Sequence, residues 1–197
     1  MKEKRIGFGL TGSFCTIPMI FGEVERLVEM GAQVTPILSH NVAAMDTRFG
    51  TAAETREKLF QLTGRRPLAT IDGVEPIGPQ RLLDLMIVAP CTGNTMAKLA
   101  NGIADTPVTM AVKSHLRNGR PVLLAIASND SLGANARNIG TLMAREHIYF
   151  VPFGQDGVEG KPNSMQSRFS LIPEAAQLAL TGKQMQPVLL GAGECLK

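Results

Sequence analysis

The strongest constraint on the fold is an alternation of short apolar runs with segments whose apolar residues recur at helical spacing. Residues 6–10 form the first run, a Thr-Gly-Ser turn follows, and apolar residues then recur at positions 20, 24, 27 and 28. This pattern indicates a strand, a tight turn and an amphipathic helix. The apolar run at 33–38 completes a β-α-β unit, which requires a parallel strand pair joined by a right-handed crossover.

The rest of the chain continues the same alternation. Further strands are expected at 85–89, 122–127 and 148–151, and helices around 51–62, 96–103, 139–143 and 172–180. The first of these strands is expected to stop at Pro90, and Ile139, Leu142 and Met143 are expected to point inward from their helix. The alternation predicts a three-layer, doubly wound α/β fold with a parallel sheet, of the Rossmann-like or flavodoxin-like kind.

Length and composition limit this fold to one domain. The chain has 197 residues, of which 44% are hydrophobic and 19% charged, so it can bury a sizeable core but is short for two domains. We expect one α/β domain over 1–197, with a loop at 152–167 and a C-terminal helix at 171–181. A loop of that length is either a lid or partner-binding segment or a flexible connection.

Composition also disfavours several functional classes. A net charge of +3 with scattered basic residues, 5% aromatic residues and no Trp is a poor basis for nucleic-acid binding. No apolar run resembles a signal peptide or a membrane span, so a cytosolic location is expected. Cys15, Cys91 and Cys195 are widely spaced, which disfavours a disulfide scaffold or a metal site and predicts small buried residues.

Residues 7–12 match the G-x-G-x-x-G pattern, but their position argues against a dinucleotide site. Only six residues precede Gly7, so the first glycines must lie within the strand rather than in the turn after it. The second strand ends in Ser39-His40-Asn41, without the acidic residue that binds an adenosine ribose. Gly12-Ser13 at a helix N-terminus would suit a monophosphate, and the alternative role for Ser13 is that of a helix cap alone.

Four predicted strands end in small polar residues. These ends are Thr11-Gly12-Ser13, Ser39-His40-Asn41, Pro90-Cys91-Thr92 and Ser128-Asn129. In doubly wound sheets, ligands bind beyond the carboxyl ends of the strands. The sequence therefore predicts a site for a phosphate or a polar cofactor tail at this edge of the sheet.

The segment from Ala89 to Asp105, APCTGNTMAKLANGIAD, carries a specific resemblance. It resembles the A-P-x-[ST]-x-N-T-x-A-K-x-A-x-G-x-x-D segment of the flavin-binding cysteine decarboxylase superfamily. The resemblance implies an FMN site in which Thr92, Asn94 and Thr95 contact the cofactor and Pro90 presents apolar backbone to the ring. The other positions that match cofactor contacts of that superfamily are Gly12, Ser13, Ser39 and Asn129.

The chain departs from these decarboxylases at three places. No His stands at 75–78, where the superfamily has its catalytic histidine; residues 126–129 retain only the Asn of its P-x-M-N motif; and 154–167 holds no Cys. Proline cannot act as a general acid or base, so the histidine's role has no substitute at Pro76. Cysteinyl decarboxylation is therefore an alternative rather than the leading expectation.

A second resemblance extends over nearly the whole chain. The segments at 4–13, 47–50, 92–94, 118–122, 152–156 and 161–165 are similar to the B subunits of dipicolinate synthases from spore-forming bacteria. The resemblance implies a part in oxidising dihydrodipicolinate to dipicolinate during sporulation, with FMN or a bound phosphate in the pocket. It also implies a homo-oligomer in the mother-cell cytoplasm, and a dehydrogenase-like A subunit that carries NADP.

No catalytic residue is identified, but Arg48 and His40 are candidates. A dicarboxylate substrate needs cationic or N–H donors, and a guanidinium can bind a carboxylate with two hydrogen bonds, which favours Arg48. His40 could move a proton near neutral pH. Each has an ordinary alternative, as a solvated surface charge or a hydrogen-bonded loop histidine. Lys161 and Asn163 are further candidates for binding a carboxylate.

Three functions remain open at this point. The first is a B subunit of dipicolinate synthase with an FMN-type pocket, the second a flavin-dependent decarboxylase, and the third a non-catalytic subunit that activates a dehydrogenase-like partner. Cys91 would lie near the cofactor by its position, whereas His115 and His147 fall near helix ends and are expected to be structural. Without its A subunit, the chain is expected to be inactive or weakly active.

Overall fold

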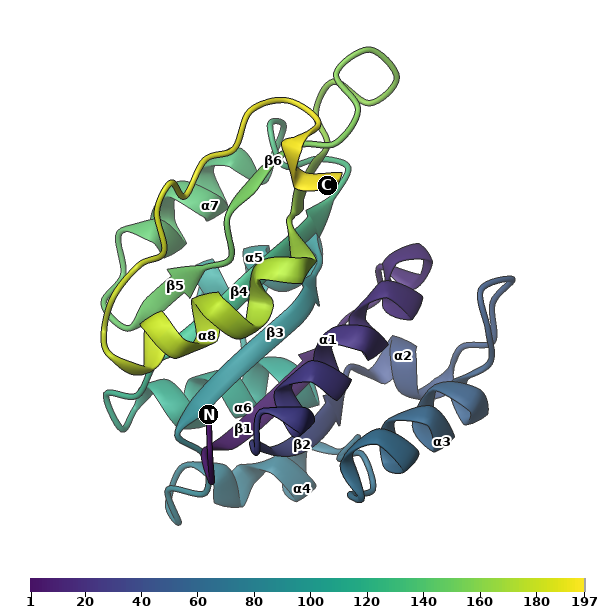
Figure 1. The fold of residues 1–197 in the computed structure, drawn as a ribbon, viewed down its shortest axis with the longest axis vertical. Coiled ribbons are helices and arrows are strands. Elements are labelled where there is room, and N and C mark those ends of the chain that lie inside the picture. The colour runs from purple at the N-terminus through teal and green to yellow at the C-terminus, as the bar shows by residue number, and fades with distance from the viewer. Residues whose placement is uncertain (197) are drawn as a thin grey trace.

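The centre of the structure is a seven-stranded sheet in the order β2-β1-β3-β4-β7-β6, with β5 also paired to β4 (Figure 1). The structure is a computed structural model, and it describes residues 1–196. Its strands are β1 (Arg5–Leu10), β2 (Gln33–Leu38), β3 (Leu85–Cys91), β4 (Val122–Ser128), β5 (Ile148–Phe150), β6 (Phe153–Gln155) and β7 (Met165–Ser167). The pairs among β1 to β5 are parallel, and β7 pairs antiparallel with both β4 and β6. The predicted doubly wound α/β fold is confirmed, with an antiparallel addition at one edge.

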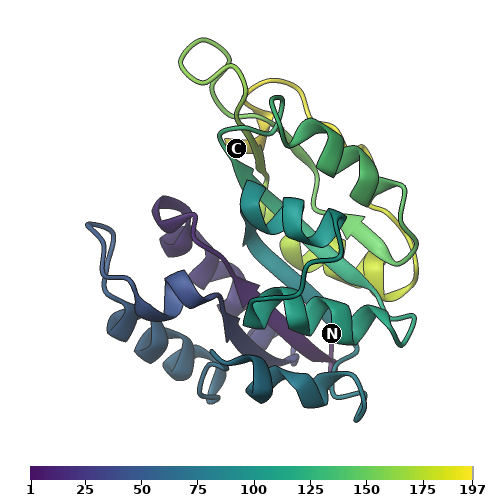
Figure 2. The same cartoon turned by 180° about the vertical axis from the view of Figure 1, so that it is seen from behind.

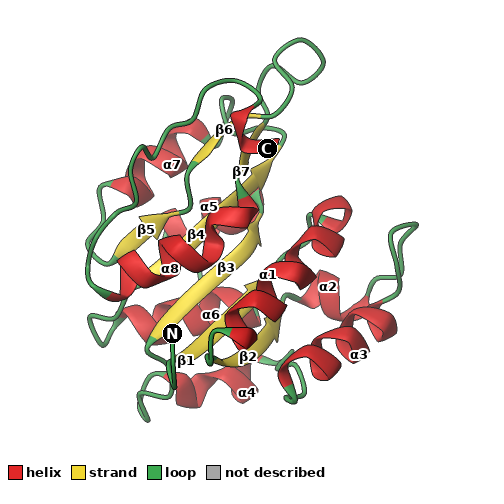
Figure 3. Cartoon of the chain, viewed as in Figure 1, coloured by secondary structure: helices red, strands yellow, loops and turns green. Residues whose placement is uncertain are grey.

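Helices cover both faces of this sheet. Figure 1 shows α1 (Ile17–Glu29) and α8 (Ile172–Leu180) in front of the strands. The reverse view in Figure 2 shows α5 (Gly93–Ala100), α6 (Pro107–Leu116) and α7 (Ala136–Met143) over the other face. The remaining helical elements, which Figure 3 separates from the strands by colour, are α2 (His40–Ala44), α3 (Ala52–Thr63), α4 (Ile71–Val74), η1 (Phe14–Thr16), η2 (Glu75–Ile77), η3 (Phe169–Leu171) and η4 (Glu194–Leu196). Over residues 1–196, no helix is long and apolar enough to cross a membrane.

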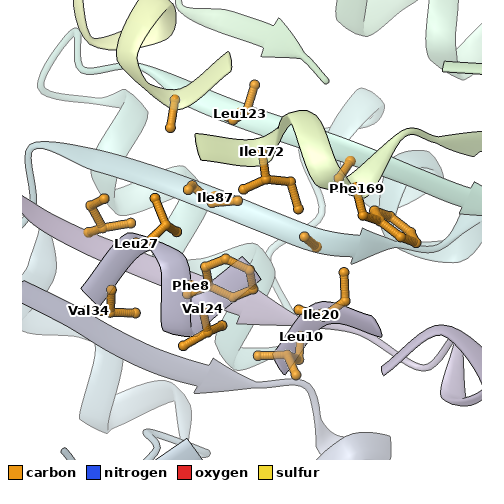
Figure 4. Close-up of a cluster of buried hydrophobic side chains, with 14 of the residues drawn as sticks. Phe8, Leu10, Ile20, Val24, Leu27, Val34, Ile87, Leu123, Phe169 and Ile172 are labelled. Carbon is orange, nitrogen blue, oxygen red and sulfur yellow. The ribbon is translucent and has the colours of Figure 1, made fainter. Parts of the chain in front are cut away.

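The two faces of the sheet bury separate apolar cores because side chains alternate along each strand. Phe8 of β1 packs with Ile20 and Val24 of α1 and with Ile172 of α8 on the face drawn in Figure 4. On the opposite face, α5, α6 and α7 cover a second cluster that includes Met86 of β3. Continuous apolar strands such as β3 and β4 are explained by this double coverage.

The glycines of the G-x-G-x-x-G match lie within β1, as predicted. A Cβ at Gly7 would lie 2.5 Å from Leu83 Cδ1, and a Cβ at Gly9 would lie 2.9 Å from Val108 Cγ1 of α6. Both distances are shorter than real side-chain contacts, so a larger residue at either position would force its neighbour to move. The two glycines therefore allow close packing against β1, and they are not part of a phosphate-binding turn.

Two strand predictions were wrong in extent. The β3 strand does not stop at Pro90 but continues to Cys91, with a register shift against β4 between Val88 and Cys91. The segment 152–167 is not a continuous loop, because it contains β6 and β7, which pair with each other. The strand β5 was recognised by its apolar run, whereas Phe-Gly-Gln in β6 and Met-Gln-Ser in β7 form no such run. Pairing with β4 helps to order β7.

Two helix details also differ from expectation. Met143 is 43% exposed rather than inward, whereas Ile139 and Leu142 are buried as predicted. Met143 is the last residue of α7, one position beyond the apolar face. The α6 helix was not predicted from the sequence. It is buried on most of its surface, polar Ser114 and His115 included, so its sequence shows no contrast between an apolar face and a solvated one.

The segment after α8 returns along β5 and β6. The side-chain amide of Gln184 donates to the carbonyl oxygen of Phe150 at 2.7 Å and accepts from the Phe150 amide at 2.8 Å. Farther on, the Phe153 amide donates to Val188 O and the Leu190 amide donates to Phe153 O. These bonds satisfy backbone groups at the open edge of the sheet, which would otherwise be free to pair with another chain.

Candidate functional site

A polar pocket of about 300 Å³ lies beyond the carboxyl ends of β1, β2 and β3, and we call it the strand-end pocket. Its lining comes from all three strand ends, from α5 and from the N-cap of α6: Thr11, Gly12, Ser39, His40, Asn41, Thr92, Asn94, Thr95, Lys98 and Thr106. Because the strand order is β2-β1-β3-β4, the chain leaves β1 toward β2 on one side and leaves β3 toward β4 on the other. Such switch points are the usual ligand sites of doubly wound sheets.

Hydroxyl groups join the ends of β1 and β3 at the base of this pocket. The Thr11 hydroxyl donates to Pro90 O at 2.7 Å and accepts from the Thr92 amide at 3.0 Å. Thr92 caps α5, with its hydroxyl accepting from the Thr95 amide at 3.3 Å and lying 3.0 Å from the Thr95 hydroxyl. Thr11 and Thr95 are both buried, so the first turn of α5 is held in one place against β1.

Lys98 brings a positive charge to the pocket, one helical turn after Thr95. Its ammonium donates to both carboxylate oxygens of Asp105, at 2.7 and 2.9 Å. These hydrogen bonds, with a smaller contribution from the charge of the pair and of His40, hold the pKa of the Asp105 carboxyl below its usual value. The Asp105 side chain is therefore a carboxylate at neutral pH, and it holds the Lys98 ammonium in place and balances its charge.

The end of β2 supplies the opposite wall. The Ser39 hydroxyl accepts from the Val42 amide at 3.4 Å and so caps the short helix α2, while the Ser39 amide donates to Leu10 O of β1. His40 and Asn41, the first residues of α2, are exposed in the pocket. The wall thus offers a hydroxyl, an amide and an imidazole, which can all bind oxygen atoms of a ligand.

The structure brings together six of the residues proposed to bind a cofactor: Gly12, Ser39, Thr92, Asn94 and Thr95 in the lining, and Pro90 as the acceptor of the Thr11 hydroxyl. Pro90 is buried and does not line the pocket. Ser13 lies at the start of η1, outside the lining. Asn129 is exposed after β4 and also lies outside it.

The end of β4 forms a separate polar cluster beside the first turn of α5. A Cβ at Gly93 would lie 2.5 Å from Asn135 Nδ2 and 2.6 Å from Ser128 Oγ. The Asp130 carboxylate organises this turn by accepting from the Ala134 amide and from the side chain of Asn135. Gly93 therefore allows this polar cluster to pack against the first turn of α5, outside the lining of the strand-end pocket.

Of the two catalytic candidates, the structure places only His40 in the strand-end pocket. The Arg48 guanidinium lies over the ring of its neighbour Phe49, 4.8 Å from the ring centroid, outside the pocket lining. Lys161 lies 3.8 Å from Asp156 in the segment between β6 and β7, and the carbonyl oxygen of Asn163 accepts from the Leu132 amide. These residues could act at this pocket only if the chain rearranged or another chain approached.

The cysteines and the other histidines are placed away from the lining. Cys91 is completely buried, and burial raises the pKa of its thiol, which disfavours the reactive thiolate. Cys195 is also buried, but Cys15 is exposed, against expectation. His115 is buried at the end of α6, where Nε2 donates to Pro121 O at 3.0 Å, and His147 is exposed.

Sequence reasoning did not single out Lys98 or Thr106 as site residues. Lys98 lies three positions after Thr95 on the same helix, so helical periodicity was a signal for its place in the pocket. Thr106 joins the pocket because the chain reverses at Gly102, whose φ is +72°. Taken together, hydroxyls, amides, a helix N-terminus and a cation suit a phosphate linked to a polyhydroxyl chain.

Comparison with known proteins extends this description. The model of the Flavoprotein family matches residues 1–167. The B subunit of dipicolinate synthase from Bacillus subtilis (strain 168) is 48% identical over 190 residues, which are 96% of this chain and 95% of that protein. The chain belongs to the Flavoprotein family, among the dipicolinate synthase B subunits. Both resemblances found in the sequence are thereby confirmed.

Solved structures agree with this membership of the Flavoprotein family. The crystal structure of the B subunit of dipicolinate synthase from Bacillus halodurans matches with a TM-score of 0.89 and 47% identity, covering 97% of this chain and 98% of that one. A dodecameric FMN-dependent UbiX-like decarboxylase from Escherichia coli O157:H7 matches with a TM-score of 0.59 and 23% identity, covering 75% of this chain and 78% of that one. At that identity the second match shows a shared fold alone.

Proposed function

We propose that this chain works with an A subunit to oxidise dihydrodipicolinate to dipicolinate, and that its strand-end pocket holds the phosphate and ribityl parts of FMN. The observation that carries the proposal is the similarity of almost the whole chain to a dipicolinate synthase B subunit. A polar pocket at the carboxyl end of β3, within the residues that the Flavoprotein family model matches, supports it. The family name and an FMN-dependent neighbour of the same fold support the choice of cofactor.

Different lining residues would bind different parts of FMN. Lys98 and the amide groups at the start of α5 would bind the phosphate, since a cation and a helix N-terminus both favour an anion. Ser39, Asn41 and Asn94 offer hydroxyl and amide groups for the ribityl hydroxyls. A pocket of about 300 Å³ is at the small end for cofactor sites, so the flavin ring would extend beyond this lining. Ser13 and Asn129, which lie outside it, are proposed to contact those outer parts.

The reaction removes two electrons and two protons from dihydrodipicolinate, formally as a hydride and a proton. FMN, when bound, would supply a two-electron acceptor. His40 supplies the imidazole in the described lining and would accept the proton as a general base. Arg48 is proposed to hold a substrate carboxylate with its two-pronged guanidinium once substrate or another chain is in place.

The proposal extends to partners and place of action. The A subunit would be dehydrogenase-like and bring NADP as the electron carrier, which agrees with glycines that lie in β1 instead of forming a dinucleotide turn. We also propose a homo-oligomer, since a neighbour of the same fold is dodecameric, and action in the mother-cell cytoplasm of a sporulating bacterium. Cysteinyl decarboxylation is not proposed, because residues 75–78, which include η2, contain no histidine.

The decisive experiment measures dipicolinate formation with this chain alone, with the A subunit alone and with both, each with and without FMN. We expect full activity only with both chains and FMN, with bleaching of the oxidised flavin absorbance when dihydrodipicolinate is added. Full activity of the A subunit alone would overturn the two-subunit proposal. Activity that needs both chains but not FMN would replace it with a non-catalytic activating role.

A further inference from the structure

A second cavity of about 500 Å³ lies away from the strand-end pocket, and we call it the α5–α6 cleft. Its walls come from the C-terminal end of α5 with the following turn, from α6, and from the residues that lead into β5. Within residues 1–196 it shares no lining residue with the strand-end pocket. The proposed function gives this cleft no role.

The floor of the α5–α6 cleft is apolar. Leu99, Val112, Leu116 and Ile148 line it from three different elements, and Ile103 stands at its edge with 47% of its surface exposed. Ile103 follows the left-handed residue Gly102, and its amide donates to Lys98 O in the bond that ends α5. An exposed isoleucine beside buried aliphatic side chains leaves apolar surface that a ligand can cover.

Cations surround this apolar floor. Lys113 and Arg117 come from α6 and its C-terminal cap, and Arg145 comes from the turn after α7. None of the three forms a salt bridge with any residue of 1–196. Arg145 donates through Nη1 to Leu99 O at 2.9 Å, which holds its guanidinium at the cleft. Glu146 is the one acidic side chain in the described lining, so the formal charge of the wall remains positive.

Helix dipoles explain part of this charge but not the whole cleft. The helices α5, α6 and α7 all end nearby, and a cation near each C-terminus is favourable. That effect needs no apolar cavity between the cations. A floor of aliphatic side chains with guanidinium groups at its rim is instead the arrangement that binds a molecule with an apolar body and a carboxylate.

We propose that the α5–α6 cleft binds a small aromatic carboxylate, with its ring on Leu99, Ile103 and Leu116 and its carboxylate on Arg117 and Arg145. The cavity volume lies within the range of small-molecule sites, roughly 300 to 1,000 Å³. Two guanidinium groups also suit a dicarboxylate, since each can form a two-pronged contact. This proposal does not depend on the proposed function.

One segment of chain, residues 98–105, connects the α5–α6 cleft to the strand-end pocket. Leu99 lines the cleft while its neighbour Lys98 lines the pocket, and Ala104 lines the cleft while its neighbour Asp105 binds Lys98. A ligand in the cleft would therefore touch the segment that holds the Lys98–Asp105 pair. Backbone signals of residues 98–105 are expected to shift when it binds.

The test uses the full chain without FMN or partner and titrates benzoate and pyridine-2,6-dicarboxylate, with benzamide as the uncharged control. Isoleucine methyl and backbone amide signals are followed by NMR. We expect saturable shifts at Ile103 and Ile148, none at the core residue Ile20, and weak or no binding of benzamide. Arg117→Gln is expected to weaken carboxylate binding by about tenfold, and the Arg117→Gln/Arg145→Gln double variant by more.

Lys58→Gln is the matched control, because it removes one exposed charge from α3, which does not line the cleft. The proposal is overturned if no probe binds, if shifts appear only at the strand-end pocket, if benzamide binds as tightly as benzoate, or if Lys58→Gln weakens binding as much as Arg117→Gln. Should Arg145→Gln unfold the chain, Arg117→Gln alone decides the result. Since no flavin or A subunit is present, failure here leaves the proposed function untouched.

Discussion

Thr11 and Thr92 are joined directly across two neighbouring strands: the Thr92 amide donates to the Thr11 hydroxyl at 3.0 Å. The same hydroxyl donates to Pro90 O at 2.7 Å, so one buried side chain satisfies two backbone groups at the end of β3. Because Thr92 also caps α5, this bond sets where the helix begins relative to β1. The geometry of the strand-end pocket thus depends on a buried hydroxyl group of one of its own lining residues.

Replacing this hydroxyl tests the link. Thr11→Val keeps the side-chain shape but leaves the Thr92 amide and Pro90 O without partners, and we expect it to lower the free energy of unfolding by about 1 to 3 kcal/mol. Urea denaturation measures this loss. Thr11→Ser retains the hydroxyl and should lose clearly less; equal losses would mean that packing of the methyl group matters rather than the bond.

Neutral substitutions of Lys98 and of Asp105 are expected to have opposite effects on anion binding. Lys98→Gln removes the pocket's cation, and we expect it to weaken FMN binding by about tenfold, while Asp105→Asn frees the ammonium and should tighten it. Quenching of flavin fluorescence measures both. Lys58→Gln on α3 controls for net charge and should bind FMN as the unaltered chain does. Weaker binding by Asp105→Asn would show that the carboxylate positions Lys98 more than it neutralises it.

A larger side chain at Gly93 is expected to crowd Ser128 and Asn135, whose polar atoms are hydrogen-bonded to Asp130. A Cβ there would lie 2.5 Å from Asn135 Nδ2 and 2.6 Å from Ser128 Oγ, so Gly93→Ala should destabilise the protein by about 1 to 3 kcal/mol through overpacking. Gly22 lies within α1 and has nothing within 4 Å of its Cβ position. Gly22→Ala is therefore the control and should stabilise by about 0.5 to 1 kcal/mol. Thermal and urea denaturation of both variants measure the contrast.

Burial of His115 predicts a loss of stability in mild acid. Desolvation by burial lowers the pKa of this imidazole from 6.5 to about 4, although the Pro121 carbonyl partly opposes the shift. The unfolded chain therefore takes up a proton that the folded chain does not, and stability falls as the pH drops from about 6.5 toward 4. The expected loss from this residue between pH 7 and pH 5 is about 2 kcal/mol.

Urea denaturation at both pH values measures this effect. His115→Gln can still donate to Pro121 O but cannot take up a proton, so its stability should change less with pH than that of the unaltered chain. An equal pH dependence in the two proteins would assign the acid sensitivity to other groups.

The returning C-terminal segment gives the last prediction. Gln184→Glu would keep an acceptor for the Phe150 amide but would set a carboxylate against Phe150 O, and we expect a loss of about 1 to 3 kcal/mol. Hydrogen exchange at Phe150 should become faster. Gln177→Glu, at an exposed position of α8, adds the same charge and should leave both measurements unchanged.

The sequence predicted those parts of the fold whose signal is local. Strands β1 to β4 and helix α1 show the periodicity of one or two buried faces, and such patterns can be read along the chain. The position of Gly7 near the start of the chain is also a local signal, and it correctly placed this glycine within β1 instead of in a dinucleotide-binding turn. Helix α6 was missed because burial on most sides removes the contrast on which amphipathic patterns depend.

Site residues were predictable to the extent that they sit at strand ends. Ser39 and Thr92 could be expected at the same edge of the sheet, since they follow parallel strands that both pair with β1. Lys98 and Asp105 are seven residues apart, and they pair only because the chain reverses at Gly102. Arg48 and Asn129 carry suitable chemistry, yet the packing of their loops keeps both out of the lining.

Local pattern was thus sufficient for strands β1 to β5, the α/β class and the polar character of the strand ends, but not for α6, β6 and β7. The features that it determined follow from side-chain periodicity and from residue type. Packing in three dimensions determined which strand ends share a pocket, how Thr11 positions α5, and that Arg117 and Arg145 meet at an apolar cleft. Those relationships join residues distant in sequence, and their energies arise only once the sheet and both helical layers are assembled.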